Sequence, residues 1–187
     1  NTIPISNTLT IDADGTLDMN GKNFTIASLQ GAGNVVSNIA GALTFTTGSA
    51  NANTTFSGAF NESSALLNIT KLGTGKLILS GSSYYTGTTL VNAGTLNIQN
   101  DGALGTSSLV TLNAVNTYLE LESSTSPINI ESTPIKINGG LVNYPYESST
   151  LKNLSGDNIW SGNIILNGNS VISSDAGTFI VNSITGT

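Results

Sequence analysis

Cysteine, histidine and arginine are all absent from this chain of 187 residues. Without cysteine, the chain can form neither a disulfide framework nor a thiolate site. Without histidine it lacks the commonest general base and metal ligand, and without arginine it lacks the side chain that binds phosphate or carboxylate groups through two parallel hydrogen bonds. Catalysis by a Ser-His-Asp or Cys-His arrangement is therefore excluded.

Charge is also scarce. Only 9% of the residues are charged, and five lysines against eleven acidic residues give a net charge of −6. Nucleic acids and anionic membranes select basic patches, so we expect neither as a partner. No apolar run approaches the roughly 20 residues of a membrane helix, so we expect no membrane insertion by this segment.

Asparagine, serine and threonine take the place of charged residues, with 24, 24 and 25 copies. These residues favour turns and strand surfaces and disfavour helix interiors. The hydrophobic content of 38% is enough to fill a core. Because no segment shows a sustained period near 3.6 residues, we predict an all-β protein with essentially no helix.

Short apolar runs recur about every eight to ten residues, which is the spacing of a β-solenoid or a β-sandwich. Many alternate strictly, as in residues 118–122, so one strand face is buried and the other is wet. We predict residues 1–187 to be a single parallel β-helix segment with rungs of about 20–25 residues, and residues 123–146 to be a less regular, loop-rich stretch. The alternative is an antiparallel β-sandwich, which hairpin pairing would distinguish.

The most informative stretch is Lys71 to Ile98, which places three short apolar strands between glycine-centred turns. Its pattern is Lys-x-Gly-x-Gly, alternating apolar residues, Ser-Gly, an aromatic residue with Thr-Gly, and Ala-Gly-Thr-Leu. These elements are Lys71, Gly73 and Gly75; Leu77 and Leu79; Ser80 and Gly81; Tyr85, Thr86 and Gly87; and Ala93, Gly94, Thr95 and Leu96.

In this pattern the stretch resembles the passenger-associated transport repeat of bacterial autotransporters, also called the autotransporter-associated β-strand repeat, over residues 67–98. One departure is Thr88, where the family often has a second glycine. The resemblance implies a right-handed parallel β-helix carried on a bacterial surface. It implies no catalytic residue, because the repeat has none.

Asp12, Asp14, Gly15 and Asp18 resemble the start of a calcium loop, in which oxygen ligands alternate before a glycine. The distal bidentate glutamate of such a loop is missing, and Lys22 lies where a further acid would help. A β-turn explains the same residues, so we expect no metal site.

Glu120 and Glu122 face the same side of one expected strand, and Glu131 follows one or two strands later. Stacked rungs could bring the three carboxylates into one acidic column suited to glycosidic chemistry. Lys136 is the only nearby base. We expect a solvated strand face instead, and therefore no enzyme, catalytic residue or cofactor.

A carbohydrate-binding or carbohydrate-cleaving β-helix is the alternative function, with aromatic rings as stacking platforms. It requires these rings to line one exposed groove beside Glu120, Glu122 or Asp157. The candidates are Tyr84, Tyr85, Tyr118, Tyr144, Tyr146 and Trp160. Residues 143–146 (Asn-Tyr-Pro-Tyr) also suggest an exposed loop with a small contact surface, and the alternative, which we favour, is that both rings cover the side of the core.

Asparagine recurs near the expected bends, where it tolerates left-handed backbone. Equivalent asparagines on successive rungs could stack into a ladder of amides. The candidates are Asn92, Asn100, Asn138, Asn143, Asn158, Asn167 and Asn169.

We therefore expect a structural or adhesive module of a secreted or surface-displayed bacterial protein. The chain begins at Asn1 and not at Met, so we expect a processed or excised piece of a longer protein. Neither residues 1–6 nor residues 183–187 look like a cap, so self-association of the ends, or contact with the rest of a longer chain, is expected. A host or cell-surface ligand is a further possible partner, and the expected location is extracellular.

Overall fold

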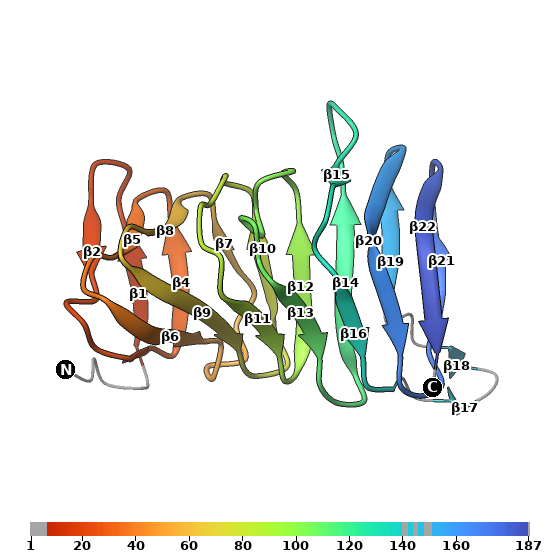
Figure 1. The fold of residues 1–187 in the computed structure, drawn as a ribbon, viewed down its shortest axis with the longest axis horizontal. Coiled ribbons are helices and arrows are strands. Elements are labelled where there is room, and N and C mark those ends of the chain that lie inside the picture. The colour runs from red at the N-terminus through yellow and green to blue at the C-terminus, as the bar shows by residue number, and fades with distance from the viewer. Residues whose placement is uncertain (1–6, 140–141, 144–145, 148–150, 187) are drawn as a thin grey trace.

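The computed structural model describes residues 7–139, 142–143, 146–147 and 151–186. These residues wind into a rod of stacked β-strands, with the first turns at one end and the last turns at the other (Figure 1). The described residues contain no helix. The all-β prediction is confirmed, and the parallel pairing described below identifies the rod as a β-solenoid.

One wall of the solenoid is an eight-stranded parallel sheet, so that seven turns lead from its first strand to its last. Its strands follow in the order β1 (Thr8–Ile11), β4 (Ser28–Gly31), β7 (Thr54–Phe56), β10 (Lys76–Leu79), β12 (Gly94–Ile98), β14 (Thr117–Glu122), β19 (Leu151–Ser155) and β21 (Ile172–Ser174).

The opposite wall is a nine-stranded sheet, and β22 pairs with its strand β20. Its strands are β3 (Phe24–Thr25), β6 (Gly41–Thr47), β9 (Ala65–Lys71), β11 (Thr88–Val91), β13 (Leu109–Leu112), β16 (Ile135–Ile137), β20 (Asn158–Leu166), β15 (Asn129–Ile130) and β22 (Phe179–Gly186). The long strand β20 pairs with both β15 and β16 of the preceding turn.

A third, three-stranded wall closes only the first turns, and consists of β2 (Thr16–Asp18), β5 (Asn34–Ser37) and β8 (Ala59–Glu62). The described pairings are parallel, except for the short hairpin of β17 (Val142–Asn143) and β18 (Tyr146–Glu147). An antiparallel sandwich is therefore excluded.

Paired residues on neighbouring turns give the length of each turn. Thr8 pairs with Ser28, and Lys76 pairs with Thr95, so these turns take 20 and 19 residues. The turn from Leu119 to Leu151 takes 32 residues, because it also contains the β17–β18 hairpin. Apart from this insertion, the turns fit the length expected from the spacing of the apolar runs.

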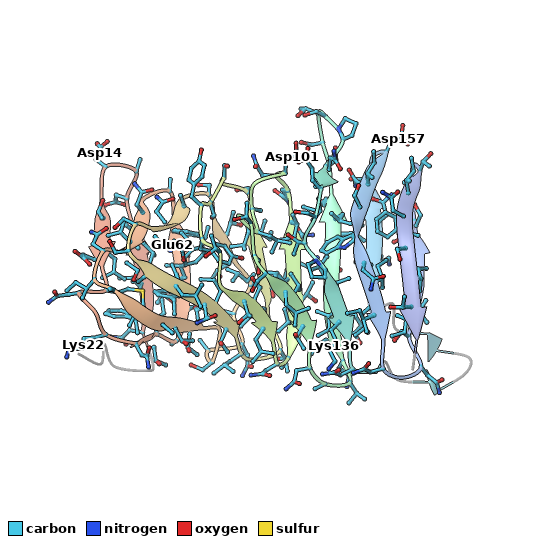
Figure 2. All side chains as sticks on the ribbon, in the orientation of Figure 1. Asp14, Lys22, Glu62, Asp101, Lys136 and Asp157 are labelled. Atoms are coloured by element: carbon cyan, nitrogen blue, oxygen red, sulfur yellow. The ribbon has the colours of Figure 1, made fainter. Side chains whose placement is uncertain are left out.

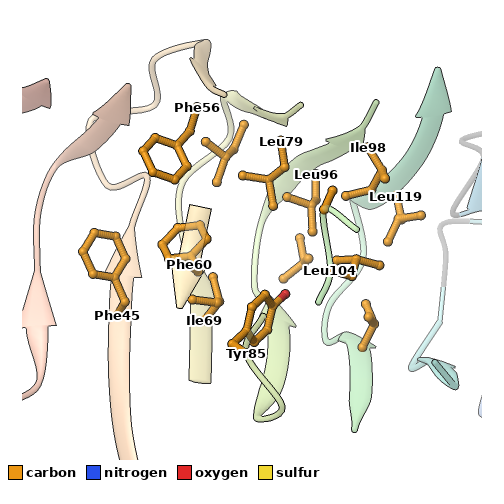
Figure 3. Close-up of a cluster of buried hydrophobic side chains, with 14 of the residues drawn as sticks. Phe45, Phe56, Phe60, Ile69, Leu79, Tyr85, Leu96, Ile98, Leu104 and Leu119 are labelled. Carbon is orange, nitrogen blue, oxygen red and sulfur yellow. The ribbon is translucent and has the colours of Figure 1, made fainter. Parts of the chain in front are cut away.

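The core is a continuous column of inward-facing side chains, because alternate residues of each strand point to the interior. Four fully buried rings form its centre in the early turns (Figure 3): Phe45, Phe56, Phe60 and Tyr85. The Phe60 ring lies 5.5 Å from Phe45 and 5.1 Å from Phe56, measured between ring centroids. Edge and tilted contacts of this kind add to the burial of apolar surface.

Trp160 is the largest buried side chain of the later turns, with 0% of its surface exposed. Its register partners are Ile130 on the preceding turn and Val181 on the following turn. The single tryptophan of the chain is thus packed between two neighbouring turns of the core.

Glycines stack at the corner between the first and third walls. A methyl group added at Gly58 would lie 1.7 Å from the Gly33 carbonyl oxygen, and one added at Gly81 would lie 2.1 Å from the Gly58 carbonyl oxygen. Only a residue without Cβ allows successive turns to approach so closely.

Gly58→Ala is therefore expected to lower the free energy of unfolding by about 1–3 kcal/mol or more, since the turns must separate to admit the methyl group. Gly186→Ala is a matched control, because its nearest neighbour is the Leu166 carbonyl oxygen at 3.8 Å. The control should stay within about 0.5 kcal/mol of the parent protein. Chemical denaturation followed by circular dichroism measures both, and equal effects of the two substitutions would contradict the steric account.

Candidate functional site

Lys71, the first residue of the repeat pattern, is the most unusual side chain in the structure, since only 2% of its surface is exposed. Its ammonium group donates to the carbonyl oxygens of Leu72 at 3.2 Å, Gly73 at 3.0 Å and Ala93 at 2.9 Å. An ammonium group has three donors, so these three carbonyls use all of them. Because Ala93 lies one turn further on, Lys71 ties two neighbouring corners together.

Burial lowers the pKa of Lys71 to about 8 from the ordinary value of 10.5. The unfolded chain therefore binds more protons than the folded chain between pH 8 and pH 10.5. Stability contributed by this residue should rise with pH across that window and level off above it. The measurement is the free energy of unfolding against pH for the parent protein minus that for Lys71→Met, which removes the other titrating groups from the comparison. A flat or falling difference would contradict this sign.

The glycines of the Lys71 corner are required by its geometry. Gly73 has a φ of +68°, in the left-handed region, and a methyl group there would lie 1.9 Å from the Gly48 carbonyl oxygen of the preceding turn. The Asn51 side chain accepts a hydrogen bond from the Thr74 backbone N–H at 2.8 Å. The Lys-x-Gly-x-Gly pattern thus forms a tight corner that is stacked directly on the corner before it.

A second element of the pattern, Tyr85 with Thr86 and Gly87, is also structural. Tyr85 is fully buried, its hydroxyl lies 2.6 Å from the Thr89 hydroxyl, and its ring meets the Phe60 ring edge-on at 6.2 Å between centroids. Burial raises the pKa of the Tyr85 phenol. A methyl group at Gly87 would lie 2.1 Å from the Leu67 carbonyl oxygen.

A ladder of four asparagine amides runs along the corner that follows the nine-stranded sheet; we call it the amide ladder. Asn113 donates to Asn92 at 2.9 Å, Asn138 donates to Asn113 at 3.2 Å, and Asn167 donates to Asn138 at 3.0 Å. The predicted ladder is confirmed for Asn92, Asn138 and Asn167. Asn113 was missed by the sequence interpretation, although it follows its strand as Asn92 follows β11.

The other asparagine candidates do not join the amide ladder. The Asn100 side chain accepts from the Gly102 backbone N–H at 2.8 Å within its own turn. Asn158 is buried and donates to Asn153 at 2.5 Å and to the Ser155 carbonyl oxygen at 2.8 Å. Asn169 has no hydrogen bond with the ladder in the described chain, and the Asn143 side chain lies outside the described residues. The ladder prediction was wrong for Asn100, Asn158 and Asn169, because asparagine occurs in several kinds of bend. For Asn143 it stays a prediction.

The carboxylates do not form the acidic column considered above. Glu120 and Glu122 lie on the outer face of β14 in the eight-stranded sheet, whereas Glu131 follows β15 of the other large sheet and is exposed. Glu120 pairs with Lys76 at 2.7 Å, and Asn97 donates to Glu120 at 3.0 Å and to Glu122 at 2.9 Å. Charged side chains are spread along the rod, as the labelled Glu62, Asp101, Lys136 and Asp157 illustrate (Figure 2).

The aspartates lie in two different bends, one before and one after β2 (Thr16–Asp18). The Gly15 backbone N–H donates to the Asp12 carbonyl oxygen at 2.7 Å, and Asp18 accepts from the Asn20 backbone N–H at 2.8 Å. Within the described ranges, no group of three or more acidic, histidine or cysteine side chains is arranged to hold a metal ion.

The aromatic rings do not line one groove. Tyr85 and Trp160 are fully buried, Tyr84 is 72% exposed, and Tyr118 donates to the Asn116 side chain at 3.2 Å. Tyr84 lies beside Asn61 of the third wall, whereas Tyr118 lies on the eight-stranded sheet. Tyr144 and Pro145, and the side chains of Asn143 and Tyr146, lie outside the described residues, so the expected contact surface there stays a prediction.

The C-terminal turn carries apolar side chains at positions that are buried in earlier turns. Ile184 pairs in register with Ile164, which is fully buried, and yet Ile184 is 49% exposed. Phe179 and Val181 are only partly buried against the core. In the described part of the chain β22 pairs with β20 alone, so the backbone groups of its other edge have no strand partner there.

These features define a class of protein, namely a parallel β-solenoid whose repeat residues are engaged in holding corners together. Residues 69–98 match the family model of the passenger-associated-transport-repeat, and this match covers 30 of the 187 residues. The chain therefore carries that repeat, as its resemblance to autotransporter passengers implied. No match is found among curated proteins or among solved structures. The described residues include no helix that is long and apolar enough to cross a membrane.

Proposed function

We propose that this chain is a structural module of a bacterial autotransporter passenger, displayed outside the cell, where it forms part of a stiff spacer. The observation that carries the proposal is the Lys71 corner, because the repeat's one buried charge donates all three protons to backbone carbonyls. Its other signature residues, Tyr85 and the stacked glycines, are used up in packing. Because the signature residues of the repeat hold the corners together and fill the core, they support a scaffold role. None of these side chains is left free for chemistry.

Display outside the cell is tested by protease treatment of intact bacteria that produce the native protein. If the chain is displayed outside the cell, fragments containing residues 69–98 should be found on the outside of the intact cells or in the medium. A cytoplasmic marker should stay intact in the same cells. Recovery of the repeat only after cell lysis would overturn the proposed location.

Stacking through the C-terminal end is the second part of the proposal. In the inner part of the rod, each turn is covered by the turn that follows it. The half-exposed Ile184 and the unpaired edge of β22 resemble the surface of an inner turn before it is covered. We propose that a further turn, from a longer chain or from a second copy, covers this end. Adhesion to a host ligand would then belong to other parts of the rod or of the passenger.

Sedimentation velocity of the chain tests the second-copy form of this proposal. Ile184→Lys should shift the protein towards monomer, because it places a charge on the covered end. Ile180→Lys is a matched control, since Ile180 is similarly exposed at 47% but pairs with Ile159 on the lateral face of the sheet. A parent protein that stays monomeric at high concentration would contradict association of copies through this end.

A further inference from the structure

Three Asn-Gly pairs occur in the chain, and all three asparagines are exposed: Asn20–Gly21, Asn138–Gly139 and Asn167–Gly168. Asn-Gly is the dipeptide most prone to spontaneous deamidation, because glycine offers no side chain to hinder attack by its own backbone nitrogen. Exposure and the neighbouring residue therefore do not distinguish the three sites, which differ in their backbone conformation and in how each side-chain amide is held.

Two of the three amides belong to the amide ladder. The Asn138 side-chain nitrogen donates to Asn113 at 3.2 Å, and the Asn167 side-chain nitrogen donates to Asn138 at 3.0 Å. These hydrogen bonds hold the side-chain amides of Asn138 and Asn167 against the asparagine of the preceding turn. Reaction would require the amide to break its bond and turn back towards the following glycine.

The third amide is held differently. Asn20 and Gly21 have φ values of +47° and +68°, and the Lys22 backbone N–H donates to the Met19 carbonyl oxygen at 3.0 Å, so the pair forms the centre of a tight turn. The backbone N–H of Asn20 donates to Asp18, but its side-chain amide makes no hydrogen bond with any described residue.

We propose that Asn20 is the deamidation site of this chain and that the amide ladder protects Asn138 and Asn167 from the same reaction. In the reaction, the Gly21 nitrogen loses its proton and attacks the Asn20 side-chain carbonyl carbon, and the C–N bond to the amide nitrogen breaks with release of ammonia. Water then opens the cyclic imide to give aspartate or isoaspartate. No oxidant, reductant or enzyme is needed.

The product would bring a new charge to the bend between β2 and β3. Asp18 already accepts from the Asn20 backbone at 2.8 Å and from the Asn38 side chain at 3.3 Å. A second carboxylate at position 20 would repel that of Asp18, and isoaspartate would also lengthen the backbone of the turn. Deamidation should therefore loosen the bend between β2 and β3 and leave the other bends unchanged.

The test follows deamidation at each site by peptide mapping of the intact, folded chain during incubation at mildly alkaline pH. Asn20 should convert about five to ten times faster than Asn138 and Asn167, which is the factor expected from breaking one hydrogen bond of ordinary strength. In denaturant the three sites should react at similar rates. Equal rates in the folded chain would overturn the proposal, as would faster reaction at Asn138 or Asn167.

Asn113→Ala gives a sharper version of the test, because it removes the acceptor of Asn138 and leaves that of Asn167 in place. Deamidation at Asn138 should then accelerate several-fold while Asn167 stays slow. Acceleration at both sites would point to a general loosening of the fold and would count against protection by the ladder, and so would an unchanged rate at Asn138. Asn163→Ala, outside the ladder, serves as the control for a lost surface amide and should change none of the three rates.

Discussion

Trp160→Ala is expected to lower the free energy of unfolding by about 3–5 kcal/mol, the range for removing a large aromatic side chain from a packed core. Trp160 is fully buried, and its register neighbours Ile130 and Val181 belong to the turns on either side. The cavity would therefore weaken two interfaces between turns at once. In a solenoid, where each turn contacts only its neighbours, such a loss is difficult for the rest of the chain to compensate.

The matched control for this substitution is Tyr84→Ala. Tyr84 is also a large aromatic residue, but it is 72% exposed, so its removal should change the free energy of unfolding by no more than about 0.5 kcal/mol. Urea denaturation monitored by circular dichroism suits both variants, because the signal does not depend on the tryptophan. Similar losses for the two variants would mean that burial in the core does not determine stability here.

Lys71→Met is expected to lower the free energy of unfolding by about 2–4 kcal/mol, because three carbonyl oxygens lose their hydrogen-bond donor in one step. The methionine side chain has a similar length and fills much of the same space, so the loss reports mainly on the hydrogen bonds at Leu72, Gly73 and Ala93. Fluorescence of the single buried tryptophan, Trp160, provides the measurement.

Lys76→Met is the control for lost charge. Lys76 lies five residues further on and pairs with Glu120 at 2.7 Å, but its side chain is 34% exposed. Ion pairs near the surface contribute about 0–1 kcal/mol, and Glu120 keeps its hydrogen bond from Asn97, so this variant should remain close to the parent protein. If the Lys76 variant lost as much stability as the Lys71 variant, the loss of a lysine charge alone would explain both results. The proposal that the buried Lys71 amine has a special role would then be wrong.

The winding of the chain could be predicted from the sequence because its signals are local. Alternation in stretches such as residues 118–122 and glycines at regular intervals give strand faces and corners directly. The stacking of Asn92 with Asn138 and Asn167 could also be anticipated, since each follows an apolar strand by one residue.

The burial of Lys71 could not be predicted in the same way. A lysine followed by glycines two and four residues later is usually solvated, and only the assembled corner shows that three carbonyls converge on its amine. Trp160 was a candidate sugar platform because its ring can stack on a sugar, and its burial could not be predicted because Ile159 and Ile165 on the outer face of the same strand are apolar as well. With apolar residues on both faces of β20, alternation does not tell which face is the core.

The direction of the amide ladder gives the rod a chemical polarity. Each asparagine in it points its NH₂ group towards the N-terminal end and its oxygen towards the C-terminal end, so four amide dipoles add head to tail. Within the described residues the row finishes on the Asn167 oxygen. That oxygen lies one turn before the open edge of β22, because Leu166 pairs in register with Gly186 of β22. The two ends of the row therefore differ chemically, with an NH₂ group at the Asn92 end and an oxygen at the Asn167 end, so an acceptor would prolong it at the first and a donor at the second.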